Sequence, residues 1–89
     1  MKLYKMLVKE YLAEYTDTLR KKRKLTQEKM AERLHITSRA YGDLERGKYC
    51  FSAIALLFLL LMLKDDEVKE FLDGFREKVY VLENKKEVA

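Results

Sequence analysis

Residues 19–47 read LRKKRKLTQEKMAERLHITSRAYGDLERG and predict two short helices joined by a tight turn. Thr26 can accept hydrogen bonds from the free amides of the first helix, and Thr37 can do so for a second helix that runs to Arg46. Gly47 then stands where the residue after a helix is commonly glycine. Apolar residues recur three and four apart on one face of each segment: Met30, Ala31 and Leu34, then Ala40, Tyr41 and Leu44. Because so short a connection makes the helices cross steeply, the second keeps one face open to solvent.

The rest of the chain predicts three more helices. Residues 3–23 carry apolar side chains at helical spacing, which predicts a long amphipathic first helix. Ser52 can cap a helix over residues 53–63, AIALLFLLLML, in which every residue is apolar. This run is far shorter than a membrane-spanning helix, which needs about 20 residues, so we expect protein to bury it on all sides. The sequence therefore predicts a single all-α domain over residues 1–89, with five helices and no strand.

An apolar seam marks the last predicted helix, over residues 65–83. Asp65 can cap this helix, and its apolar residues repeat at four-three spacing, which is typical of a helix–helix contact. The seam comprises Val68, Phe71, Leu72, Phe75, Val79 and Leu82. We expect it to join two copies of the chain or, alternatively, to cover the helix over residues 53–63. Gly74 either weakens this helix or lets another segment approach it closely.

The motif at residues 26–47 resembles the phage repressor and Cro type of helix-turn-helix family, also called the xenobiotic-response-element (XRE) family. The resemblance covers residues 15–63 and rests on Leu19-Arg20, Thr26-Gln27, Met30-Ala31 and Glu45-Arg46-Gly47. Three positions depart from the family pattern: His35 replaces a usual Gly, Phe51 replaces a frequent Pro, and Gly42 lies inside the second motif helix. The resemblance implies a repressor-like five-helix domain, here with a long N-terminal helix and an added C-terminal helix.

By position, the resemblance assigns a DNA-facing surface to the motif. Its members are Gln27, Thr37, Ser38, Arg39, Gly42, Asp43, Lys48 and Tyr49. In the family geometry the second motif helix enters the major groove, Gln27 binds a phosphate, and Lys48 and Tyr49 contact the backbone. Arg39 is the strongest candidate for base reading, because a guanidinium can contact guanine O6 and N7 together, worth about 1–3 kcal/mol of discrimination. Asp43 can accept from cytosine N4, or it can orient Arg39.

Positive charge is concentrated in the half of the chain that carries the motif. Residues 1–50 hold 13 Lys and Arg against 7 Asp and Glu, whereas residues 51–89 hold 6 against 8. A dense basic run precedes the first motif helix and comprises Lys21, Lys22, Arg23 and Lys24. These side chains are candidates for phosphate contacts, and a solvated helix end is the alternative. The resemblance further implies a structural ion pair between Arg20 and Glu45.

Other function classes lack the residues they need. The chain has one His, one Cys, no glycine-rich phosphate loop and no paired acids on an apolar face. We therefore predict that it is not an enzyme and that it uses no metal or cofactor. Cys50 has no partner for an internal disulfide and the N-terminus does not read as a signal peptide, so we expect a cytoplasmic protein without membrane association. We expect His35 and Cys50 to have structural roles.

Two functions remain as hypotheses. The first is sequence-specific binding of double-stranded DNA by a transcriptional regulator, most simply a repressor that occupies an operator as a homodimer. The second is an antitoxin or other regulatory module that uses the same fold to bind a protein partner. The salt dependence of DNA binding distinguishes them, because phosphate contacts weaken steeply as salt rises.

Overall fold

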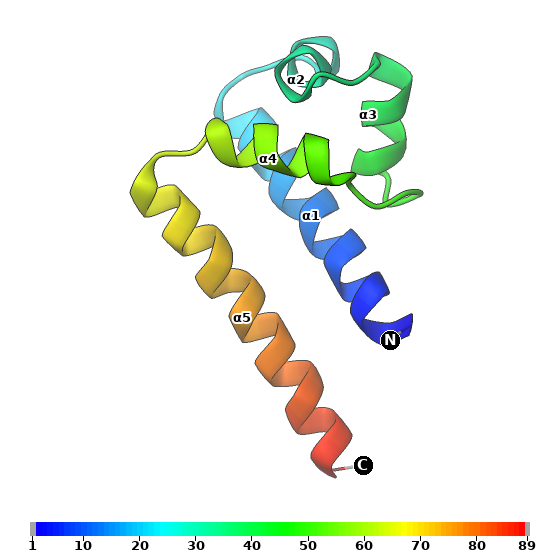
Figure 1. Cartoon of the computed structure of the whole chain (residues 1–89), viewed down its shortest axis with the longest axis vertical. Helices are drawn as coiled ribbons and strands as arrows, with labels where there is room; N and C mark the ends of the chain where they lie inside the picture. Colours follow the sequence, from blue (N-terminus) through cyan, green and yellow to red (C-terminus); the bar gives the residue numbers. More distant parts are fainter. Residues whose placement is uncertain (1, 89) are drawn as a thin grey trace.

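The computed structural model describes residues 2–88, with side chains as far as residue 85, and contains no strand within that range (Figure 1). Its helices are α1 (Lys2–Lys22), α2 (Gln27–Leu34), α3 (Ser38–Glu45), α4 (Ala53–Leu61) and α5 (Asp65–Val88). The predicted all-α fold is confirmed. Two helix ends differ from the prediction by more than one residue. α4 stops two residues early, where the amides of Met62 and Leu63 tighten onto carbonyls three residues back, and α5 continues five residues past residue 83.

The motif helices begin and end as their sequence predicts. The hydroxyls of Thr26, Thr37 and Ser52 each accept a hydrogen bond from the backbone amide three residues later, at 3.1 Å in every case. α2 ends at His35, whose φ of 61° is left-handed, so this histidine takes the conformation that glycine usually supplies. Gly47 follows α3 with a φ of 75°. These caps fix the short turn that sets α3 across α2.

The core lies where α1, α2, α3 and α4 meet. Figure 1 shows α1 passing behind α4 and beside α3, with α2 above them. The buried apolar residues of this cluster come from every helix: Leu12, Leu19, Met30, Ala31, Leu34, Tyr41, Leu59 and Phe71. Burial of this cluster anchors α3 on α1 and α2 on α3 and α4, and the outer face of α3 stays exposed to solvent.

α5 packs on α1 of its own chain. The ring of Tyr11 lies 5.5 Å from that of Phe71 and 5.4 Å from that of Phe75, and its hydroxyl donates to the Phe71 carbonyl at 2.7 Å. A Cβ added to Gly74 would lie 2.5 Å from the Tyr11 hydroxyl oxygen, so this glycine permits a close approach. Phe71 is 6 % exposed and is therefore a core residue here, which corrects its assignment to a dimer contact.

Neither expected role describes the main contact of the seam, which packs on α1 and not on the helix over residues 53–63. Val68, Phe75, Val79 and Leu82 are partly buried, whereas Leu72 is 49 % exposed. The seam thus serves first to cover α1, because the tyrosines of α1 offer it an aromatic surface. Leu72 is the large side chain of the seam that stays exposed to solvent.

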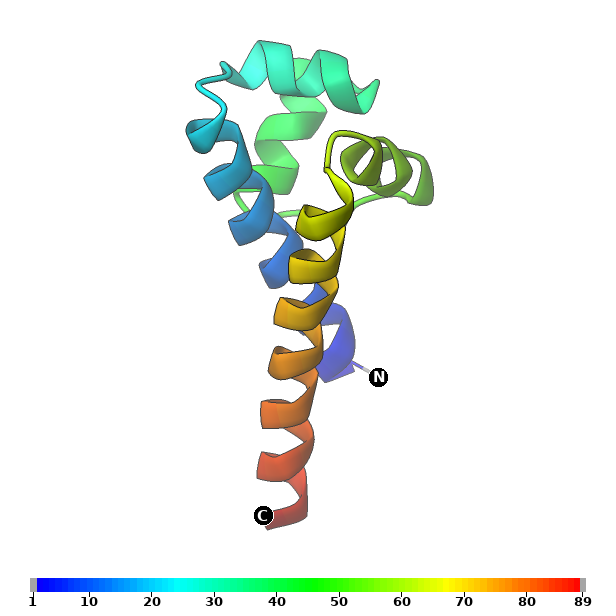
Figure 2. The same cartoon turned by 90° about the vertical axis from the view of Figure 1, so that its left-hand side faces the viewer.

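α4 is covered on one side only. Ala55 and Leu59 are buried, but Ile54, Leu57 and Leu61 are 63 %, 61 % and 77 % exposed. The prediction that protein buries this helix on all sides is therefore wrong for a single chain. The reason is geometric: α2 packs on its inner side, while α5 runs away along α1 (Figure 2). Among the described helices, none is long and apolar enough to cross a membrane.

Candidate nucleic-acid interface

The first turn of α3 is open to solvent. Thr37, Ser38 and Arg39 are exposed, whereas Tyr41 and Leu44 on the opposite side are buried. Within residues 2–85, no hydrogen bond or ion pair engages the Arg39 guanidinium. The arrangement presents an uncommitted arginine at the end of the helix that, in this type of motif, meets base edges.

The second turn of α3 is occupied by an ion pair that the sequence prediction missed. Arg46 binds the carboxylate of Asp43, so Asp43 orients this arginine and does not orient Arg39. Gly42 is buried, and a Cβ added there would lie 3.3 Å from the Arg46 guanidinium, so the prediction that Gly42 faces the groove is corrected. The Arg46 side chain is 68 % exposed and stands seven residues after Arg39, on the same face, so Gly42 lies on the predicted face but is covered there by Arg46. The seven-residue spacing between Arg39 and Arg46 is the sequence feature that could have predicted their shared face.

A polar network fixes α3 against α1. Arg20 Nε donates to Glu45 Oε2 at 2.9 Å, and Gln27 Nε2 donates to Glu45 Oε1 at 2.9 Å. The buried Tyr41 hydroxyl donates to the same carboxylate. The side chains of Arg20 and Glu45 are only 15 % and 11 % exposed, which makes this the ion pair implied by the family resemblance. One amide proton of Gln27 is used here, and its second proton remains for a phosphate.

The hydrogen-bond network around Glu45 determines the protonation states of Glu45 and Tyr41. Burial acts to raise the pKa of Glu45, but hydrogen bonds from Arg20, Tyr41 and Gln27 outweigh it and hold that pKa below the ordinary value. Burial, assisted by the Glu45 carboxylate, raises the pKa of Tyr41. At neutral pH the site therefore holds an ionised Glu45 and a protonated Tyr41, the charge states that donate and accept correctly.

The basic run before α2 divides into engaged and open side chains. Arg23 donates to Glu67 at 3.0 Å and is 27 % exposed, so it ties α1 to the start of α5. Lys21 pairs with Asp17 at 3.1 Å on its own helix. Lys22 reaches Glu67 only at 3.9 Å. Lys24 is exposed with a left-handed φ of 57°. Lys21, Lys22 and Lys24 project into solvent and stay candidates for phosphate contact, whereas Arg23 is held by α5.

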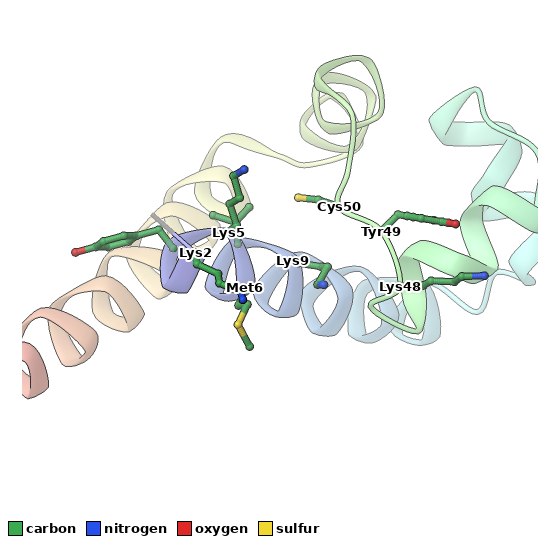
Figure 3. Close-up of a pocket in the computed structure, with 9 residues that line it drawn as sticks. Lys2, Lys5, Met6, Lys9, Lys48, Tyr49 and Cys50 are labelled. Atoms are coloured by element: carbon green, nitrogen blue, oxygen red, sulfur yellow. The ribbon is translucent and has the colours of Figure 1, made fainter.

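A second basic surface lies beside α3 and was not predicted. A groove of about 720 Å³ separates the first half of α1 from the loop after α3, and its described lining contains four lysines and no acid. The lysines of this lining are Lys2, Lys5 and Lys9 of α1 and Lys48 of the loop, and Figure 3 shows Lys5 extending from α1 toward the side of the loop that carries Cys50. Lys48 Nζ lies 5.4 Å from the centre of the Tyr49 ring, a cation–π distance. The spacing of Lys2, Lys5 and Lys9 predicts that they share one face of α1. The sequence did not predict that this face borders the loop after α3.

The described residues do not bring together the ligands of a metal site. No group of three or more His, Cys, Asp or Glu side chains within them can hold a metal ion. His35 stacks on Phe58, with ring centres 3.9 Å apart, and Cys50 is an exposed free thiol. The stacking gives His35 a packing role at the turn.

Comparison with known proteins identifies the motif. A family model described as helix-turn-helix matches residues 18–64, which spans α2, α3 and α4 and the end of α1. No match was found among curated proteins or solved structures. The matched region contains both the exposed first turn of α3 and the Arg20–Glu45 network.

Proposed function

The chain belongs to the helix-turn-helix family of the XRE type, and from this premise we propose that it is a transcriptional repressor that reads operator DNA with α3. The observation that carries the proposal is the uncommitted Arg39 on an exposed first turn, on a helix fixed from behind by the Glu45 network. A helix that is rigidly held and carries an unpaired guanidinium is suited to bidentate reading of guanine. Ser38 and Thr37 can add hydrogen bonds to neighbouring bases or phosphates.

Two basic surfaces support the proposal by offering phosphate contacts on either side of α3. The exposed lysines of the run before α2, Lys21, Lys22 and Lys24, lie on one side, and Lys48 with Tyr49 lies on the other. The α1 lysines Lys5 and Lys9 continue the second surface along the groove. Contacts of this kind position the protein and make its affinity depend on salt.

Occupation of an operator is sufficient to repress, because a bound protein blocks polymerase sterically. We propose that the repressor is a cytoplasmic homodimer, since an operator with two half-sites matches the twofold symmetry of a pair of chains. A role as an antitoxin or other protein-binding module is the competing function, and it predicts weak DNA binding without sequence preference.

A fluorescence-anisotropy titration tests the proposal. The wild type, Arg39→Ala and a control, Arg33→Ala, are titrated against the DNA upstream of the gene and a scrambled duplex, each at two salt concentrations. Arg33 is an exposed arginine of α2, so its removal changes the same charge away from the first turn of α3. We expect Arg39→Ala to reduce the preference for the upstream duplex by about 5- to 150-fold, and Arg33→Ala to leave that preference intact.

The same titration tests the groove lysines. Replacing both Lys5 and Lys9 with Ala should lower affinity for the two duplexes equally and reduce the slope of log K against log salt by about 1 to 2. Equal, weak binding to both duplexes that Arg39→Ala does not change would contradict the repressor proposal and favour the protein-binding role.

A further inference from the structure

An exposed apolar stripe runs along the outer side of α4. Ile54, Leu57 and Leu61 form this α4 stripe, and each is more than 60 % exposed, while Leu59 on the inner side is 0 % exposed. Figure 1 shows α4 lying across α1 with no other described helix in front of it. Soluble proteins rarely leave several large aliphatic side chains together in water, and such clusters mark interaction surfaces.

The spacing of the α4 stripe is that of a helix–helix contact. Its members are three and then four residues apart, the interval at which side chains of one helix fit between those of another. The inner side of α4 already uses Ala55 and Leu59 for the core of its own chain. The outer stripe therefore offers a second, independent packing face.

The described parts of the same chain are engaged elsewhere. α2 packs on the inner side of α4, and α5 packs on α1 through Tyr11, Phe71 and Phe75. Figure 2 shows α5 running away from α4 along the direction of α1. The α4 stripe thus stays uncovered by every described helix of its own chain.

The chemistry of the α4 stripe selects its partner. Residues 53–63 contain no charged or polar side chain, so the stripe offers nothing to a phosphate backbone or to a charged peptide. A second copy of the chain brings an identical uncharged stripe, and a twofold axis sets the two together without burying a charge. Antiparallel packing also opposes the two helix dipoles.

We propose that the α4 stripe is the homodimer contact, with α4 of one chain packed antiparallel on α4 of a second copy. The inference rests on the proposed function, because it names the contact that pairs two DNA-reading chains. It places that contact on α4 and not on the α5 seam, whose Phe71 and Phe75 are engaged with α1.

The small exposed area of the α4 stripe limits the affinity of the dimer. Three side chains expose a patch of a few hundred Å², below the about 800 Å² per partner of a standard interface. The free dimer is therefore weak, with dissociation in the micromolar range or above. Two adjacent half-sites hold two chains at high effective concentration, so DNA stabilises the pair.

Sedimentation equilibrium of the full chain tests the contact without DNA. The variants are Leu57→Glu in the α4 stripe and Tyr80→Glu on α5, whose parent side chains are equally exposed at 61 % and 62 %. We expect the wild type and Tyr80→Glu to dimerise with rising concentration and Leu57→Glu to weaken dimerisation at least about tenfold. Leu61→Glu, at the most exposed stripe position, should do the same, and circular dichroism checks that each variant keeps its helices.

Two results would overturn the inference. A wild type that stays monomeric up to the highest soluble concentration, and also binds an inverted repeat without cooperativity, has no α4 dimer. Dissociation by Leu72→Glu together with no effect of Leu57→Glu would move the contact to the α5 seam.

DNA separates this inference from the proposed function. Leu57→Glu should bind a single half-site as tightly as the wild type and bind the inverted repeat at least about tenfold more weakly. If no duplex is bound specifically, the repressor proposal fails while sedimentation still decides the dimer. If the half-site is bound but Leu57→Glu changes nothing on the inverted repeat, the α4 contact fails and the DNA-binding role stands.

Discussion

The motif and the α4–α5 half of this protein are stabilised in opposite ways. Around Glu45, one buried carboxylate accepts hydrogen bonds from Arg20, Gln27 and Tyr41, and so joins α1, α2 and α3. No buried side-chain nitrogen or oxygen in the described residues lacks a partner. The α4–α5 half depends on aromatic packing instead and leaves the α4 stripe in solvent.

The comparison shows that one chain satisfies the contacts of its motif but leaves the apolar outer side of α4 exposed. The motif holds α3 in place with contacts from its own chain alone, so a single copy has the formed α3 surface that the proposed function requires. The α4 face has exposed apolar surface that only another molecule can remove from water. We infer that reading DNA requires one chain and that stable occupation of an operator requires two.

Removing the Glu45 carboxylate is the largest single perturbation of the motif. Glu45→Ala leaves the largely buried Arg20 with only the Leu25 carbonyl at 2.9 Å and Asp17 at 3.5 Å, and it removes the acceptor of the buried Tyr41 hydroxyl. We expect it to lower the free energy of unfolding by about 3 kcal/mol in urea denaturation. The control is Glu32→Ala, whose surface pair with Lys29 is at least 65 % exposed on both sides and should contribute less than about 0.5 kcal/mol. Similar small losses in both variants would show that the network does not hold the motif.

Gly74→Ala perturbs the other half by crowding α5 against α1. Alanine suits a helix better than glycine, but its Cβ would meet the Tyr11 hydroxyl at 2.5 Å, so we expect a net loss of about 1–2 kcal/mol. Tyr11→Phe removes that oxygen and leaves the nearest ring carbon at 3.4 Å, an ordinary contact. The double variant should therefore be more stable than Gly74→Ala alone. A double variant that is no more stable would show that the glycine serves another purpose.

Acid should weaken the motif through Glu45. It should also weaken the α1–α5 contact through Glu67, because a hydrogen bond from the Lys64 backbone amide holds the pKa of Glu67 below its ordinary value. The folded pKa of Glu45 lies below its unfolded value of about 4.3, so its contribution is complete above that pH and is lost as pH falls through the folded pKa. Urea midpoints measured from pH about 6 to about 3 should fall for the wild type, and Glu45→Gln should flatten part of that fall. An unchanged slope in Glu45→Gln would assign the acid sensitivity to other carboxylates.

Gly42→Ala is the smallest of these changes and should stabilise the motif. The added methyl would meet only the end of the flexible Arg46 side chain at 3.3 Å, while the helix gains up to about 1 kcal/mol in propensity. The thermal midpoint should rise by a few degrees. A lower midpoint would mean that Arg46 cannot move away, and that its pairing with Asp43 is more rigid than its exposure indicates.

The sequence predicted the elements that local chemistry controls. The caps at Thr26, Thr37 and Ser52 and the inward faces of α2 and α3 are local properties, and the structure has them, although Ala40 is only partly buried. The sequence did not predict which side of α4 is buried. The spacing of apolar residues indicates that a helix face packs against something, but it does not identify the segment that packs there. The Arg46–Asp43 pair was missed because helical spacing allows Asp43 to pair either with Arg39, four residues before it, or with Arg46, three residues after it.

Selection of binding sites from a random duplex library tests the central claim most directly, since the library contains every candidate half-site and the protein itself chooses among them. The account predicts enrichment of an inverted repeat whose half-sites contain a guanine read by Arg39 and lie about 10 base pairs apart, or a multiple of that distance. Arg39→Ala should lose the preference for that guanine and keep the rest of the pattern. A wild-type protein that enriches no sequence above the starting library would contradict the account.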